Sequence, residues 1–468
     1  MTLSRRTFLK SAAAAGALAL TRPWGALAET LGPAASVSTS RSSRLFSGVQ
    51  LVHADLHNHT LMSDGDGNAE AAFGSMRSAG LDVAALTDHS TIQWGSPVDP
   101  CVGDLCGGEA SDLAGIDEAK WARTAELADL ANADGSFIAV RGFEWSSPFQ
   151  GHMNVWFSNQ WIDPLHTAGV STGEGYLPYA NEFAHEEGLP PMSPAVIKAY
   201  DAALKALPTS GTTMIPFYEW LKLNPGTPVL GGGADGLAQF NHPGREPGRF
   251  GYFKHQKNLP GIIGMEIFNR KDDYLFQGTE YGQQSPLNEC LNAGWKVGLT
   301  GVTDEHGTKW GFEPGKGRTG LWVSQWSRAG VRQALQARRF FATREAGLRI
   351  DASAKRSPMG SFIQHTSGNV QFKLDIDRGP EWPNGKVLNV QVLRPGTSMP
   401  TVVTNRTITV PADTGSVITF SVPLDIADGK WVVLRVTDPS QPADSRARPY
   451  WQTFGRAVAY TSPWFLTP

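Results

Sequence analysis

The chain has 468 residues, which exceeds one ordinary domain, and 41% of them are apolar, which excludes a largely disordered protein. Lysine and arginine number 41 against 44 acidic residues, so the formal net charge of −3 provides no overall basic field for nucleic-acid binding. Three cysteines are too few for a disulfide framework. We therefore expect a folded protein of two or three domains with no nucleic-acid partner.

Residues 1–28 have the pattern of an export signal. Residues 4–10, SRRTFLK, resemble a twin-arginine motif, residues 11–20 form a short apolar run, and Ala26-Leu27-Ala28 resembles a small-residue cleavage site. A membrane anchor or a buried helix is the alternative, but the run is shorter than the roughly 20 apolar residues that span a bilayer. The prediction is a twin-arginine signal peptide, recognised by the export machinery, on a periplasmic or secreted protein with no stable membrane span.

Residues 45–346 have the pattern of an α/β domain. Apolar runs, typical of strands buried on both faces, alternate with helical or loop segments along this part of the chain. A helix is expected near 69–79, and the apolar runs are 81–86, 137–140, 237–240, 262–267 and 297–300. Such strands favour a parallel sheet covered by helices. Residues 156–230 interrupt the pattern as a helical or loop insertion, with one amphipathic helix expected near 194–207.

The period changes in residues 347–468. Val370, Phe372, Leu374 and Ile376 alternate with polar neighbours, and residues 388–392 repeat this pattern. A period of two with glycine and proline turns is typical of antiparallel strands that bury one face. We therefore expect a small antiparallel β-sandwich domain at the C-terminal end of the chain.

Ionisable side chains gather at or just after the ends of five predicted strands, at residues 51–56, 81–86, 137–143, 237–240 and 297–302. The nine candidates are His57, His59, Asp64, His89, Glu144, His152, His242, Asp304 and His306. Because β/α barrels bring the carboxyl ends of their strands to one rim, we expect these side chains to converge. A single histidine at a strand end is more often a hydrogen-bonded structural residue. Nine nitrogen and carboxylate ligands without sulfur, however, suit two or three divalent ions of Mn, Zn or Fe.

These residues also resemble the motif set of a known family. The motifs His57-x-His59 with Asp64, Thr87-Asp88-His89, Glu144, His152, His242-Pro243 and Asp304-x-His306 resemble, in this order, the polymerase-and-histidinol-phosphatase (PHP) superfamily, and most closely its secreted, amidohydrolase-like branch. The resemblance covers about residues 50–345. It implies a distorted (β/α)7 TIM-like barrel with a hydrolytic site for two or three metal ions.

The resemblance also implies how the ligands are shared. Carried over by position, one ion would be held by His57, His59, Glu144 and Asp304. Glu144 would bridge to a second ion held by His152 and His242, and a third would be held by Asp64, His89 and His306. Asp64 stands where some members of the family have histidine.

The chemistry expected of such a centre is hydrolysis. A water that bridges two ions loses a proton near neutral pH, and the resulting hydroxide attacks phosphorus or an acyl carbon. We expect Glu144 and Asp304 to be catalytic, and Arg245 to clamp an anionic substrate, with a surface salt bridge as the alternative role of Arg245.

The sequence favours an exported phosphoesterase acting on a small phosphomonoester or phosphodiester. The alternative is a metal-dependent hydrolase of carboxylic ester, carbamate or amide bonds. A non-catalytic, metal-stabilised binding or envelope protein is the third hypothesis.

Overall fold

The computed structural model describes most of the chain after residue 40. The described residues are 41–90, 115–147, 150–162, 214–226, 232–245, 248–254, 259–277, 279, 284–311, 317–377, 385–410, 417–442 and 456–468. The export signal expected at 1–28 and the helix expected at 194–207 lie outside the described residues. No helix within the described ranges combines the length and the apolar composition that a membrane crossing requires.

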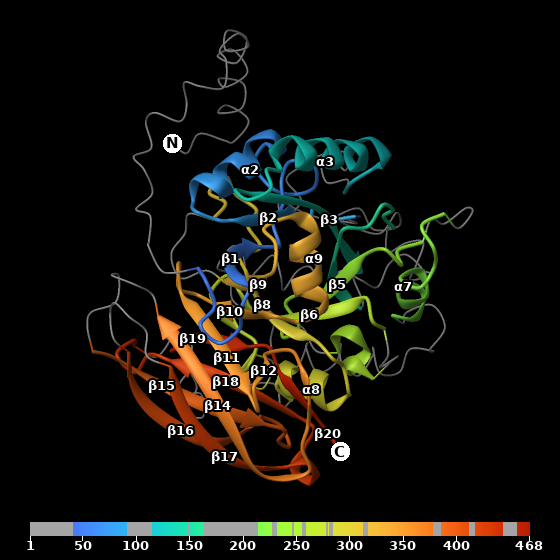
Figure 1. Ribbon diagram of the computed structural model, residues 1–468. Helices are drawn as coiled ribbons and strands as arrows, with labels where there is room; N and C mark the ends of the chain where they lie inside the picture. The colour runs from blue at the N-terminus through green and yellow to red at the C-terminus, as the bar shows by residue number, and fades with distance from the viewer. Residues whose placement is uncertain are drawn as a thin grey trace, which may run out of the picture. The chain divides into compact units, whose positions relative to one another are not determined.

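A large sheet carries the strands that precede the ionisable clusters (Figure 1). Its strands in this part are β1 (Gln50–Asp55), β2 (Val83–Leu86), β3 (Ile138–Ser147), β4 (Gly151–Trp156), β5 (Leu237–Phe240), β6 (Ile262–Asn269) and β8 (Gly298–Val302). The pairs β1–β2, β2–β3, β5–β6 and β6–β8 are parallel. Nearly every residue in these strands is buried, as the apolar runs indicated.

The expected parallel sheet contains one antiparallel strand in this part, β4, which was not among the predicted apolar runs. This strand runs antiparallel to both β3 and β5, because it returns from β3 after a short turn near Gln150. Two antiparallel pairings in succession leave β3 and β5 pointing in the same direction. The strands β1, β2, β3, β5, β6 and β8 therefore all end at one edge of the sheet.

Helices cover this sheet, and the two longest described helices begin at side-chain caps. The described helices are α2 (Ala69–Ser78), α3 (Glu118–Ala131), α7 (Ile215–Trp220), α8 (Pro286–Asn292) and α9 (Arg328–Gln336), with a 3-10 segment η2 (Arg249–Phe253). The side chains of Asn68 and Asp117 accept hydrogen bonds from the first turns of α2 and α3 and satisfy backbone donors that would otherwise lack partners. Phe73 of α2 and Leu127 of α3 belong to one apolar cluster with the neighbouring strands.

The large sheet continues beyond the last predicted α/β strand. The strands β9 (Arg318–Val323) and β10 (Phe340–Thr343) extend it antiparallel from β1, and β10 pairs in turn with β19 (Ala457–Thr461) near the end of the chain. Val37–Pro468 accordingly forms one compact unit. The domain boundary expected at 346/347 stays a prediction.

A second, four-stranded antiparallel sheet lies in the C-terminal part. Its order is β12 (Ser357–Pro358), β11 (Arg349–Ala354), β14 (Ser367–Asp377) and β17 (Ile418–Asp425). The large sheet adds β7 (Asp272–Asp273), β13 (Phe362–Gln364), β15 (Lys386–Arg394), β16 (Thr401–Val410), β18 (Trp431–Thr437) and β20 (Trp464–Thr467). Val370 and Phe372 of β14 share one apolar core with Val390 of β15 and Leu434 of β18. The C-terminal alternation thus corresponds to sheets that bury one face together.

Candidate metal centre

All nine candidate residues meet at the common edge where the strands end. The loop after β1 carries His57, His59 and Asp64, and β2 is followed by His89. Glu144 and His152 lie within β3 and β4. His242 follows β5, while Asp304 and His306 follow β8.

Glu144 occupies the middle of the cluster. Its carboxylate lies 2.9–3.5 Å from ring nitrogens of five histidines: His57, His59, His89, His152 and His242. Oε1 faces three of them, and Oε2 faces His59 and His89. The side chain is buried, and Asn241 Nδ2 donates a 2.6 Å hydrogen bond to Oε1. The Glu144 carboxylate therefore connects the three histidines that face Oε1 with the two that face Oε2.

The donor set fits divalent cations. Oε2 of Glu144 is buried and has no hydrogen-bond partner among the described residues, although His89 Nδ1 lies only 2.9 Å away. Nε2 of His57 and Nε2 of His59 face each other at 3.0 Å. Ligand atoms at about 2.1 Å from a shared ion are roughly 3.0–3.5 Å apart, so these separations are those of ligands around a cation.

Within the described residues, three groups of side chains each bring one ligand atom per residue within 4.8 Å of one another. They are His57, His59 and Glu144; His89, Glu144 and His152; and His59, Asp64, His89 and His306. Oδ1 of Asp304 adjoins the first group, 3.3 Å from Nε2 of both His57 and His59. The sequence assigned His89 to the third ion alone, together with Asp64 and His306. In the structure His89 belongs to two groups, because its Nδ1 faces Glu144 while its Nε2 faces Asp64.

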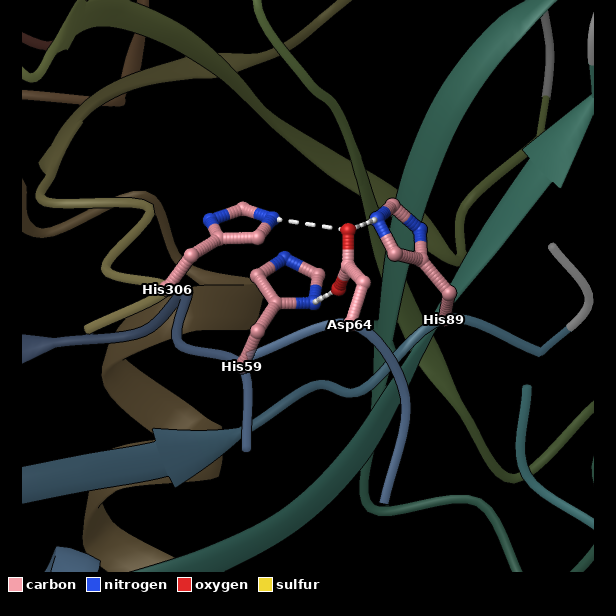
Figure 2. A group of neighbouring side chains, drawn as sticks. All are labelled: His59, Asp64, His89 and His306. Atoms are coloured by element: carbon pink, nitrogen blue, oxygen red, sulfur yellow. Dashed lines mark ion pairs between the residues drawn. The ribbon is translucent and has the colours of Figure 1, made fainter. Parts of the chain in front are cut away.

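The Asp64 group, whose four side chains Figure 2 shows, is the most open of the three. Oδ2 of Asp64 lies 3.3 Å from His306 Nε2 and 3.4 Å from His89 Nε2, and Oδ1 lies 3.6 Å from His59 Nδ1. The side chains of Asp64 and His306 are 19% and 20% exposed, whereas that of Glu144 is 1% exposed. Asp88 holds the loop before Asp64, because it accepts hydrogen bonds from Thr60 N and Ser63 Oγ.

The histidines of the cluster differ in the direction in which their surroundings shift their pKa values. Burial opposes the charged form of Glu144 and Asp304, but neighbouring histidines outweigh it and keep the pKa of each carboxyl well below its usual range. Burial also lowers the pKa of His57 and His89, yet the adjacent carboxylates raise the pKa of both well above the usual value. Burial and the nearby His306 and His89 lower the pKa of His59 to about 3.

Glu266 was missed by the sequence analysis, although it lies directly beside the centre. Its Oε1 lies 2.7 Å from His57 Nδ1, and its Oε2 accepts a 2.6 Å hydrogen bond from the backbone N of His242. It sits fully buried in β6, which was expected only as an apolar run. A carboxylate inside an otherwise apolar strand was the available signal, because a buried charge requires partners.

Three arginines adjoin the ligands. Nη2 of Arg245 donates to Asp304 Oδ2 at 3.0 Å, and Arg245 is only 7% exposed, which excludes the alternative of a surface salt bridge. Nη1 of Arg249 lies 2.6 Å from His242 Nδ1. Arg270 donates to the carbonyl oxygen of Asp304 through Nε at 3.1 Å and Nη2 at 3.0 Å. Arg249 and Arg270 lie outside the motifs expected from the sequence, so neither was predicted at the site.

The backbone is strained at two of the candidate ligands. The φ angles of His242 and Asp304 are +29° and +50°, in the left-handed region that residues other than glycine rarely adopt. Such conformations cost on the order of 1–3 kcal/mol and persist only where the surroundings impose them. Here the contacts with Glu266 and Arg270 hold the two backbones in place.

Comparison with known proteins gives likenesses to solved structures only. No family model matches the chain, and no curated protein matches it. A two-domain protein from Bacteroides vulgatus containing a predicted PHP-like metal-dependent phosphoesterase is 14% identical, with a TM-score of 0.40, covering 91% of this chain and 98% of its own.

Two further solved structures are similar over part of the chain. A proposed metal-dependent phosphoesterase from Bifidobacterium adolescentis is 16% identical, with a TM-score of 0.29, over 60% of this chain and 95% of its own. An amidohydrolase from Chromobacterium violaceum, solved with sulfate and without metal, is 17% identical, with a TM-score of 0.25, over 54% of this chain and 87% of its own. All three TM-scores lie below 0.5.

Proposed function

We propose that the chain is a multinuclear metal-dependent hydrolase of the PHP type, with the distorted TIM-like barrel of that family, and that it acts on a small phosphomonoester or phosphodiester. The observation that supports this most directly is the buried carboxylate of Glu144 among five histidine rings. Uncompensated burial of so many ionisable groups is costly, and bound cations offset the carboxylate charge. Structural metal sites are usually closed and few, so this cluster does not favour a purely structural role.

The ligands divide into three candidate ion positions. The first is His57, His59, Glu144 and Asp304, the second is Glu144, His89, His152 and His242, and the third is His59, Asp64, His89 and His306. Bound divalent ions would supply an activated water at neutral pH and polarise the ester. The protein contributes orientation, since Glu266, Asn241 and Arg270 fix the groups that face the ions.

The charge around the centre favours a phosphate ester over a neutral ester. Arg245, Arg249 and Arg270 bring three guanidinium groups against its ligands. Guanidinium groups bind phosphate oxygens in a planar, two-pronged geometry, and they stabilise the negative charge of the substrate. Hydrolysis of carboxylic ester, carbamate or amide bonds is the second candidate, because the same ions serve that chemistry.

The test is a substrate screen with metal-replete, full-length protein. We expect turnover of an aryl phosphate or bis-aryl phosphate, loss of activity with a chelator, and recovery with Mn²⁺ or Zn²⁺. The variant Glu144→Gln removes the shared carboxylate charge and should abolish most activity, while Glu118→Gln, on the exposed first turn of α3, serves as the matched control.

Other results of the screen would favour one of the alternative functions or contradict the role of Glu144. Turnover of aryl acetates or carbamates without turnover of phosphate esters would favour hydrolysis of carboxylic ester, carbamate or amide bonds as the function. Metal-replete protein that turns over neither panel would favour the binding protein. Full activity of Glu144→Gln would remove Glu144 from the centre.

We also propose export of the folded protein to the periplasm or beyond by the twin-arginine route, supported by Arg5 and Arg6 in residues 4–10. Replacing both arginines with lysine should retain the protein in the cytoplasmic fraction, as followed by cell fractionation and blotting. Unchanged export of this double variant would contradict the proposal.

A further inference from the structure

The β6–β7 hairpin holds Asp304 in place. At its tip, Arg270 adopts a positive φ of +49° and donates two hydrogen bonds to the carbonyl oxygen of Asp304. Asn269, beside it, donates to Oδ2 of Asp304 at 3.2 Å and to Oε2 of Glu266 at 2.9 Å. Because Asp304 itself has a strained backbone, its position depends on where this hairpin lies.

The second strand of the hairpin is anchored by the C-terminal part of the chain. Asp273 of β7 accepts the hydroxyl of Tyr460 at 3.0 Å on both carboxylate oxygens. Tyr460 lies on β19, and its hydroxyl accepts a 2.8 Å hydrogen bond from Nε of Arg435 on β18. Nη1 of Arg435 donates to Gln391 on β15. Strands that lie more than 110 residues later in the chain are therefore connected to the hairpin through the hydrogen bond between Tyr460 and Asp273.

This anchor is buried and charged. Asp273 and Tyr460 have no exposed surface and Arg435 has 1%. Replacing buried ionic groups with apolar residues of similar size is often neutral or stabilising, so stability alone gives little reason for such a network. What hydrogen-bonded groups of this kind provide is a fixed geometry, because each donor and acceptor has few alternative partners.

We propose that Tyr460 and Arg435 are positioning residues of the metal centre: through Asp273 they fix the β6–β7 hairpin, and through Asn269 and Arg270 they fix Asp304. The inference rests on the proposed function only in that it takes Asp304 to be a ligand. The C-terminal β region is then a structural part of the hydrolytic site. Loss of the Tyr460–Asp273 contact weakens metal binding without touching any ligand.

The test is Mn²⁺ binding by full-length variants, followed by EPR titration of free Mn²⁺ and by metal analysis after dialysis. Tyr460→Phe removes one hydroxyl, and Asp273→Asn, as a second variant, removes the charge that this hydroxyl contacts. Both should weaken Mn²⁺ binding roughly 10-fold, the lower end of what loss of a group supporting a ligand costs. Tyr218→Phe is the matched control, because the Tyr218 hydroxyl is buried and has no hydrogen-bond partner among the described residues.

A second control separates positioning from general stability. Phe420→Ala removes a core ring from β17, in the second sheet, and should lower the melting temperature while leaving Mn²⁺ affinity unchanged. Wild-type affinity in both Tyr460→Phe and Asp273→Asn, or an equal loss in Phe420→Ala, would overturn the inference. If Mn²⁺ binding behaves as expected but no ester is hydrolysed, the proposed function fails while the inference stands. A wild-type protein that binds no Mn²⁺ overturns both.

Discussion

Oε1 of Glu266 lies 2.7 Å from Nδ1 of His57, and this contact fixes which nitrogen of the ring can face the metal centre. An ionised carboxylate accepts hydrogen bonds only, so His57 in the neutral form that a metal ligand requires keeps its proton on Nδ1 and leaves the lone pair of Nε2 for an ion. Carboxylates that support ligating histidines in this way raise the basicity of the ring and set its orientation.

Glu266→Gln should therefore weaken metal binding without removing a ligand. The amide can still approach Nδ1, but it carries no charge and can present its donor group instead, so we expect metal affinity or kcat to fall roughly 10- to 100-fold. Isothermal titration with Zn²⁺ measures the affinity. Glu118→Gln should be indistinguishable from wild type, and a Glu266→Gln protein with wild-type affinity would show that His57 is oriented by other contacts.

Asp64 should govern one ion and leave the others in place. It contributes to the most exposed of the three groups, and its carboxylate is the only one there. We expect Asp64→Asn to lose about one equivalent of metal, because a neutral amide is a weaker ligand than a carboxylate. Asp66→Asn is a close control, since Asp66 is exposed and two residues away. Metal analysis that gives equal contents for Asp64→Asn and wild type would exclude an ion at Asp64.

Metal binding should release protons at neutral pH. The raised pKa values of His57 and His89 mean that the metal-free protein carries a proton on each ring at pH 7, whereas a metal ligand must be neutral. Binding therefore displaces the protons of these two rings, and affinity rises as the pH rises through their pKa values. His59, with its pKa of about 3, releases none.

Calorimetry of this binding in buffers of different ionisation enthalpy gives the number of protons directly. The apparent binding enthalpy should change linearly with the ionisation enthalpy of the buffer at pH 7, and the slope should fall at higher pH. An apparent enthalpy that is the same in every buffer would mean that both rings are already neutral in the metal-free protein.

The convergence of the nine candidate residues could be predicted because it needs only the direction of the strands. His57, His242 and Asp304 lie just beyond strand ends, Glu144 lies in the second half of β3, and the strands that carry them run the same way. The antiparallel strand β4 does not change this result, because β3 and β5, which are both antiparallel to β4, run in the same direction.

The groups that support the ligands could not be predicted in the same way. Glu266 lies in the middle of an apolar run, and Arg270 lies at the tip of a two-residue turn, so neither belongs to a pattern that local periodicity detects. The pairing of β10 with β19 brings Phe341 opposite Thr461, 120 residues later in the chain. Such a pairing depends on which sheet edges meet, and the sequence near either strand does not specify its partner.

The close packing of β8 against β10 and the residues after β19 can be tested by substituting Gly298. A Cβ on Gly298 would lie 2.4 Å from Cζ of Phe340 and 2.5 Å from Oγ of Ser462, so both would have to move. Overpacking of this kind costs about 1–3 kcal/mol, and we expect Gly298→Ala to lower the free energy of unfolding by that amount. Gly74→Ala is the matched control: its Cβ meets nothing within 4 Å on the exposed side of α2, and alanine should stabilise the helix by about 0.5–1 kcal/mol. Denaturant unfolding of the two variants should shift in opposite directions, and a Gly298→Ala protein as stable as wild type would mean that these strands do not pack as closely as described.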